Sequence, residues 1–131
     1  MASGAANVFE HGQIPGSLEL ALVGDSVYDL YVRSSLVKKG GRLRDIHLKA
    51  VKRVNAHAQS EALLKIEASL TEEESEIVRR ARNAKQTPTK NADAGEYHRA
   101  TALEALIGYL YLTKQEDRLK EILRTCLDME G

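Results

Sequence analysis

Two helical segments, far apart in the chain, each carry an acidic residue where an apolar one is expected. Leu18–Leu36 reads LELALVGDSVYDLYVRSSL, and Tyr97–Leu112 reads YHRATALEALIGYLYL. Both segments are apolar on nearly every side, so we predict that both are buried. Asp25 interrupts the first and Glu104 the second. Because a buried carboxylate is costly unless it is paired or holds a metal, these two acids are the best candidates for function.

The length and composition predict one all-α domain. A chain of 131 residues forms one ordinary core. It contains no tryptophan, one phenylalanine and two prolines, and it leans towards Leu, Ala, Glu, Lys and Arg, which favour helices over strands. Residues 1–16 are small and polar, and we expect a flexible lead-in there, followed by a single domain over residues 17–131.

No segment has the pattern of an export signal or a membrane span. Residues 1–16 lack a basic region followed by an apolar run. No apolar stretch approaches the roughly 20 residues that a bilayer crossing requires. We therefore expect a soluble protein without membrane association, located in the cytoplasm.

Capping signals predict where the helices begin and end. Ser17 is a plausible N-cap for the first helix, which Gly40 and Gly41 end. Asp45 is a plausible N-cap for a helix that continues to about Leu64. The sequence TEEE at residues 71–74 fits a capping box, so these three glutamates are predicted to start a helix that runs to about residue 82 rather than to bind metal. Residues 83–95 form a loop, and a short amphipathic helix closes the chain.

The charges are strongly segregated although the net charge is zero. Residues 33–53 hold eight Lys or Arg against one acid, whereas residues 61–76 hold six acids against one Lys. Residues 79–90 are basic and contain no acid. Such segregation makes the local potential larger than the net charge suggests and permits nucleic-acid binding. A set of solvated helix faces explains the same pattern.

Asp25 and Glu104 are predicted to approach each other across a helix pair. Gly24 and Gly108 would allow close approach of the two backbones, and facing carboxylates can chelate Mg²⁺. A polar group satisfied within a tight helix crossing is the alternative for Asp25. Asp29 projects from the same side as Asp25 one turn later, and an ion pair with Arg33 is the alternative for it.

The two motifs resemble those of a known family. LALVGDSVYDLYVR is similar to the signature helix of the ribonuclease III catalytic domain, and TALEALIGYLYL is similar to that family's second signature. The resemblance covers roughly Leu18–Leu127 and is closest to the mini-ribonuclease III branch, which lacks a double-stranded-RNA-binding domain. DIHLKAVKRVNAHAQSE and RRARNAKQTPTKN also resemble that branch.

The resemblance implies a ribonuclease III-like helical bundle that acts as a homodimeric, magnesium-dependent endonuclease on double-stranded RNA. It implies products with 5′-phosphate and 3′-hydroxyl ends and a role in maturing the large-subunit (23S) ribosomal RNA precursor. Asp25 and Glu104 match the catalytic, metal-binding acids of the motifs. Two positions depart from the full-length enzymes, because Ala21 and Thr101 stand where those enzymes have acids.

A nuclease without an accessory module must grip RNA with its catalytic domain, through phosphates and 2′-hydroxyls. The first group of candidates lies on the loop after the capped helix and comprises Arg82, Lys85 and Lys90. The second group lies in the earlier basic segment and comprises His47, Lys49, Lys52 and Arg53.

Two other functions stay open at this point. The first is an inactive ribonuclease III-like domain that binds RNA or assembles a ribonucleoprotein, which Ala21 and Thr101 favour. The second is a small helical, metal-dependent nucleotide hydrolase, which also uses carboxylates on facing helices. It would leave the basic segments without a purpose.

Overall fold

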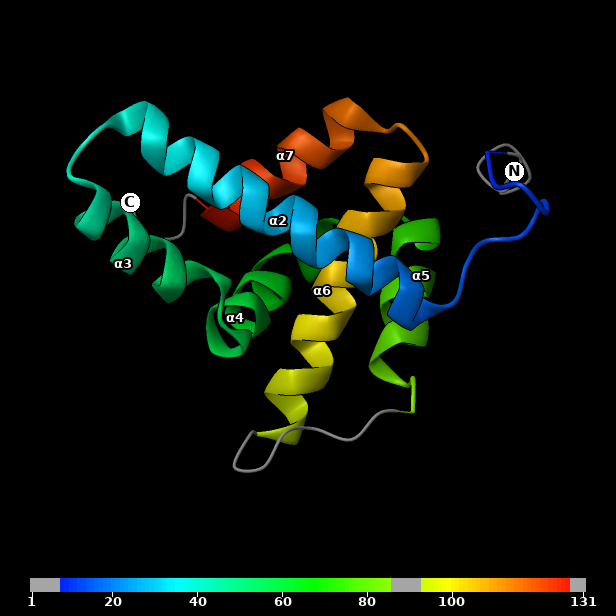
Figure 1. The fold of residues 1–131 in the computed structure, drawn as a ribbon. Helices are drawn as coiled ribbons and strands as arrows, with labels where there is room; N and C mark the ends of the chain where they lie inside the picture. The colour runs from blue at the N-terminus through cyan, green and yellow to red at the C-terminus, as the bar shows by residue number, and fades with distance from the viewer. Residues whose placement is uncertain (1–7, 86–92, 128–131) are drawn as a thin grey trace.

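A computed structural model describes residues 8–85 and 93–127 and confirms the predicted all-α fold. No strand occurs in these two ranges. Their helices are α2 (Ser17–Lys39), α3 (Leu43–Val54), α4 (Ala56–Ile66), the 3₁₀ turn η1 (Glu67–Ser69), α5 (Glu72–Arg82), α6 (Ala94–Leu112) and α7 (Glu116–Leu127) (Figure 1). None of the described helices has the length and apolarity that a membrane crossing requires.

Helix α6 is the centre of the bundle, as its sequence predicts. It packs against α2, α4, α5 and α7, and α2 crosses it in Figure 1. Every residue from Ala100 to Leu103 and from Ala105 to Leu110 is buried. A helix surrounded on all sides needs apolar residues on all sides, which explains why this segment lacks a polar face.

Helix α2 crosses α6 at two glycines. A Cβ atom built on Gly24 would lie 1.6 Å from the backbone oxygen of Glu104, and one built on Gly108 would lie 2.0 Å from the backbone oxygen of Leu20. Any side chain at either position would therefore collide with the opposite backbone. The predicted close approach is confirmed, and it brings the Asp25 turn next to the Glu104 turn.

The prediction that α2 is buried on all sides is wrong. Its inner face is buried, but Leu22, Leu30 and Val37 are 74%, 63% and 61% exposed. These three residues lie on one side of the helix, given 3.6 residues per turn. The apolar residues of the outer side are thus uncovered in the single chain, whereas those of α6 are covered by neighbouring helices.

The predicted helix from Asp45 to Leu64 is two helices that meet at Asn55. The backbone of Asn55 is extended, with φ −78° and ψ 164°. Its side-chain oxygen accepts from the backbone N–H of Ala58 at 2.8 Å, and its amide donates to the backbone oxygens of Val51 and Lys52. One asparagine side chain therefore satisfies free groups of both helix ends.

Two predicted N-caps are also wrong. Helix α3 begins at Leu43 with Arg42 as its N-cap, so Asp45 lies in its first turn. Helix α2 begins at Ser17 itself, after Gly16. Asp45 still complements the positive end of the helix dipole from inside the first turn.

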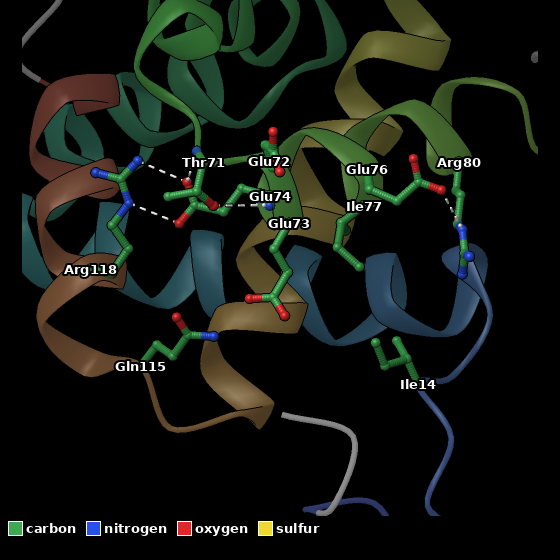
Figure 2. Close-up of a pocket in the computed structure, with 10 residues that line it drawn as sticks. All are labelled: Ile14, Thr71, Glu72, Glu73, Glu74, Glu76, Ile77, Arg80, Gln115 and Arg118. Carbon is green, nitrogen blue, oxygen red and sulfur yellow. Dashed lines mark hydrogen bonds and ion pairs between the residues drawn. The ribbon is translucent and has the colours of Figure 1, made fainter. Parts of the chain in front are cut away.

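The predicted capping box at the start of α5 is confirmed. Glu74 donates its backbone N–H to the Thr71 hydroxyl, and its carboxylate accepts from the Thr71 backbone N–H at 3.0 Å. Arg118 of α7 donates to both oxygens of the same carboxylate at 2.8 and 2.9 Å (Figure 2). These bonds lower the pKa of Glu74 against the opposing effect of its burial. The charged pair joins α5 to α7.

The lead-in is described only from residue 8. Residues 8–16 are not helical, and Ile14 packs against the core. The division into a flexible lead-in over residues 1–16 and one domain over residues 17–131 stays a prediction.

Candidate functional site

Asp25 and Glu104 line the same pocket, at the crossing of α2 and α6. The pocket has a volume of about 410 Å³. The two carboxyl groups are close enough to share a hydrogen bond. Asp25 is exposed and Glu104 is half-buried, so the expectation of two buried acids holds only in part. The described lining residues are Leu18, Ala21, Leu22, Asp25, Val54, Ala56, Gln59, Tyr97, Ala100, Thr101 and Glu104.

The environment of Glu104 disfavours its charged form. Burial, together with the hydrogen bond and the negative charge of Asp25, raises the pKa of Glu104 to about 8. The amide side chain of Gln59 has the opposite, smaller effect. None of the described lining residues is Lys or Arg. The pair thus lacks a cationic partner within the pocket, and a bound cation would favour ionisation of both acids.

The donor set fits a hard divalent cation that keeps several of its waters. Oxygen ligands suit Mg²⁺, which is commonly held by only one or two carboxylates. Ala21 and Thr101 also line this pocket, and neither adds a carboxylate to it. Within residues 8–85 and 93–127 there is no group of three or more His, Cys, Asp or Glu side chains arranged around a common metal position. Two carboxylates are therefore what the described chain offers.

Asp29 does not belong to the carboxylate pair of the pocket. It accepts a hydrogen bond from Nε of Arg33 at 2.9 Å, and it is not among the described lining residues of the pocket. The alternative prediction, an ion pair one helical turn apart, is confirmed.

A larger hollow of about 920 Å³ lies at the start of α5, and its described lining shares no residue with the pocket of Asp25. Figure 2 shows the contacts of Glu74 and Glu76, whereas Glu72 and Glu73 are drawn without a marked contact. Glu74 is held by Thr71 and Arg118, and Glu76 pairs with Arg79 and Arg80. The prediction that Glu74 serves the helix start is confirmed, and this hollow is not the candidate centre.

The basic residues of α3 lie beside the pocket rather than in it. His47, Lys49 and Lys52 are exposed, while Arg53 is half-buried. Lys52 and Arg53 line a separate hollow of about 260 Å³ whose described residues do not overlap with those around Asp25. The contact between the two regions is made by Val54, which ends α3 and lines the pocket.

The loop candidates are placed only in part. Arg82 donates to the Glu67 carboxylate at 3.0 Å, so its charge is partly neutralised. Lys85 is exposed just after α5, and Lys90 lies outside the described residues.

Gln59 is a pocket residue that the search for acids missed. It lies on α4 and is 3% exposed. Four and seven residues later on the same helix face come Leu63 and Ile66, which are also buried. A polar residue on this apolar face indicates a buried polar site, but the face can be recognised only when the start of the helix at residue 56 is known.

The fold and site define an all-α domain with a carboxylate pair at a glycine-lined helix crossing. The ribonuclease III domain family matches residues 18–115, and the chain belongs to the ribonuclease III family. Members are endoribonucleases that act on double-stranded RNA, and they are generally metal-dependent and dimeric.

Similar proteins cover most of the chain. A mini-ribonuclease 3 of Symbiobacterium thermophilum is 44% identical over 85% of this chain and 87% of its own length. A mini-ribonuclease 3 of Enterococcus faecalis is 41% identical over 93% of this chain and 95% of its own length. A crystal structure of a Fusobacterium nucleatum protein superimposes with a TM-score of 0.81 at 36% identity, covering 88% of this chain and 94% of that one. The predicted family and fold are confirmed.

Proposed function

We propose that this protein is a magnesium-dependent endoribonuclease that cleaves double-stranded RNA, with Asp25 and Glu104 as catalytic metal ligands. The observation that carries this proposal is the facing pair of carboxylates in a pocket without Lys or Arg among its described lining. We further propose that it acts in the cytoplasm on the large-subunit (23S) ribosomal RNA precursor, on the strength of its likeness to the mini-ribonuclease III branch.

The two acids would hold the metal ion from different depths of the pocket. Asp25 lies at the exposed side of the pocket, where a phosphodiester can reach it, whereas Glu104 is held further inside by the helix crossing. A bound Mg²⁺ supplies activation of a water molecule and stabilisation of negative charge on the phosphodiester.

Asp25→Asn or Glu104→Gln should reduce cleavage of a perfect RNA duplex at least about 100-fold, on the order of losing one charge-stabilising group. Both variants should still bind the duplex, because phosphate contacts elsewhere supply the affinity. Cleavage with Mg²⁺ is followed by gel electrophoresis, and end analysis should find 5′-phosphates and 3′-hydroxyls. Removal of metal with a chelator should stop the wild-type reaction.

Asp29→Asn is the matched control, since it makes the same change on the same helix outside the pocket. It should retain activity. Cleavage at near wild-type rate by either pocket variant would refute the role of that residue. A wild-type protein that binds duplex RNA but never cuts it, with or without Mg²⁺, would favour the inactive binding domain instead.

For RNA binding we propose two sets of basic residues, the loop surface and the α3 surface. The loop surface comprises Arg82, Lys85 and Lys90, and the α3 surface comprises His47, Lys49, Lys52 and Arg53. Lys85 is the better loop candidate among the described residues, because Arg82 is already paired with Glu67.

Lys85→Ala combined with Lys90→Ala should weaken duplex binding and lower its salt dependence. Each lost phosphate contact reduces the slope of log affinity against log salt by about 1. Lys120→Ala on α7, at another exposed position, is the control. Binding measured by fluorescence anisotropy at several salt concentrations tests this, and an unchanged slope would dismiss the loop as a contact surface.

We also propose that two copies of the chain associate through the outer side of α2. Leu22, Leu30 and Val37 expose apolar surface there, and their exposure would be reduced in such a homodimer.

A further inference from the structure

Helix α4 directs one amide side chain into the pocket of Asp25 and Glu104. Gln59 lines this pocket and is 3% exposed. Its backbone N–H donates to the Asn55 carbonyl at 3.0 Å, within the first turn that Asn55 caps. The position of Gln59 is therefore set by the break between α3 and α4.

The amide nitrogen of Gln59 is a buried donor without an acceptor. Nε2 has no hydrogen-bond partner within the described part of the chain. Buried polar groups are almost always hydrogen-bonded, and one left without a partner destabilises the fold. The carboxylate of Glu104 is the acceptor next to it. The Gln59 side chain already lowers the pKa of Glu104, so this carboxylate lies within its reach.

Two cross-links hold the α4 turn of Gln59 against α6. Nδ1 of His57 contacts the Glu96 carboxylate, and Nε of Arg99 donates to the Ser60 hydroxyl at 2.6 Å. These contacts come from residues on both sides of Gln59 in the sequence. They fix the helix that carries Gln59 relative to the helix that carries Glu104, as a positioning interaction requires.

Two other residues of the pocket bring no charged group to Glu104. Ala21 has no polar atom in its side chain, and the hydroxyl of Thr101 donates to the backbone oxygen of Tyr97 at 3.1 Å. Both residues line the pocket, and neither adds a carboxylate to it.

We propose that Gln59 is a positioning residue whose side-chain amide donates to the Glu104 carboxylate and orients it toward a divalent cation shared with Asp25. This inference rests on the proposed metal site. Groups that orient a metal ligand in this way typically change metal affinity by 10–100-fold.

The test is metal binding by the RNA-free protein. Gln59→Met keeps the length of the side chain and removes the amide. Isothermal titration calorimetry with Mn²⁺ should show a dissociation constant raised by about 10-fold or more. The Mg²⁺ concentration for half-maximal cleavage should rise by a similar factor, while the rate at saturating Mg²⁺ stays close to that of the wild type. Gln115→Met, the same change at a residue that lines the separate hollow at the start of α5, should alter neither value.

A second measurement needs no variant. The side-chain amide protons of Gln59, assigned through its own backbone by NMR, should shift when Mg²⁺ is added to the wild-type protein. A metal affinity of Gln59→Met equal to that of Gln115→Met, or amide resonances that stay fixed at saturating Mg²⁺, would overturn the proposal for Gln59 alone, provided that Asp25→Asn abolishes binding. If the wild type binds no divalent cation and cuts no duplex, the proposed function fails first, and the role of Gln59 fails with it.

Discussion

The charge of Glu104 depends on its surroundings in the pocket. Burial and the neighbouring Asp25 raise its pKa to about 8, whereas an unfolded chain ionises glutamate near 4.3. Between these two values the folded protein holds a proton that the unfolded chain has lost. This bound proton contributes to the free energy of unfolding. The contribution is fully present below about pH 4, decreases as the pH rises towards 8, and is lost above that.

In the metal-free protein, Glu104→Gln should therefore raise the free energy of unfolding at pH 9 by about 1–3 kcal/mol, because it removes the forced ionisation of a half-buried acid. The gain should be smaller at pH 5. Urea denaturation with a chelator at both pH values measures this, with Glu10→Gln in the exposed lead-in as the control. A destabilised variant at pH 9 would show that the carboxylate has a favourable partner in the metal-free fold.

At the scale of helices, the α2–α6 crossing decides whether the two acids can meet. Gly24 and Gly108 each face the backbone of the other helix, and each lies within four residues of a pocket acid. The missing side chains let two backbones touch, so that short carboxylate side chains reach one another. If the two helices lay further apart, the carboxylates of Asp25 and Glu104 could not reach the same cation.

Gly108→Ala should destabilise the protein by about 1–3 kcal/mol or more, because an added methyl group would lie 2.0 Å from a backbone oxygen that cannot move independently. This effect should exceed the gain of about 1 kcal/mol from better helix propensity. At Gly95, by contrast, an added Cβ would meet only the side chains of Asp93 and Arg99, at 3.2 Å or more.

Gly95→Ala is therefore the matched control, and it should be neutral or slightly stabilising. Urea denaturation of the two variants compares them directly. Equal stability of Gly108→Ala and the wild type would mean that the crossing is looser than the structure shows.

At the scale of the whole molecule, the outer side of α2 is the part of the fold that a single chain leaves uncovered. Isolated exposed leucines are common, but a row of three on one helix is typical of an interface. The family is generally dimeric, and a second copy of this chain would bring the same row of residues to the contact.

Leu30→Glu should convert the proposed dimer into a monomer, because it places a charge at an apolar contact. Light scattering coupled to gel filtration gives the mass directly. Leu64→Glu on α4, which is also an exposed leucine, should leave the dimer intact. A monomeric wild type, or a dimeric Leu30→Glu, would exclude this side of α2 as the interface.

Some features could be predicted because they depend on neighbours in the sequence. The capping box of Thr71 and Glu74 requires only four consecutive residues, and the pair of Asp29 and Arg33 requires one helical turn. Asn55 shows the limit of this reasoning. A pattern of apolar residues continues past it, but its side chain satisfies the ends of two helices and stops both.

The sequence by itself determined the family and the helical class and pointed to the two acids as candidates, because periodicity and short motifs are properties of consecutive residues. Only the tertiary structure decided which face of α2 stays exposed, that Asp25 is open to solvent, and that Gln59 of α4 faces Glu104 of α6. These depend on how separate helices pack. A sequence pattern gives the faces of one helix, but the partner of each face is chosen by the packing of the whole chain.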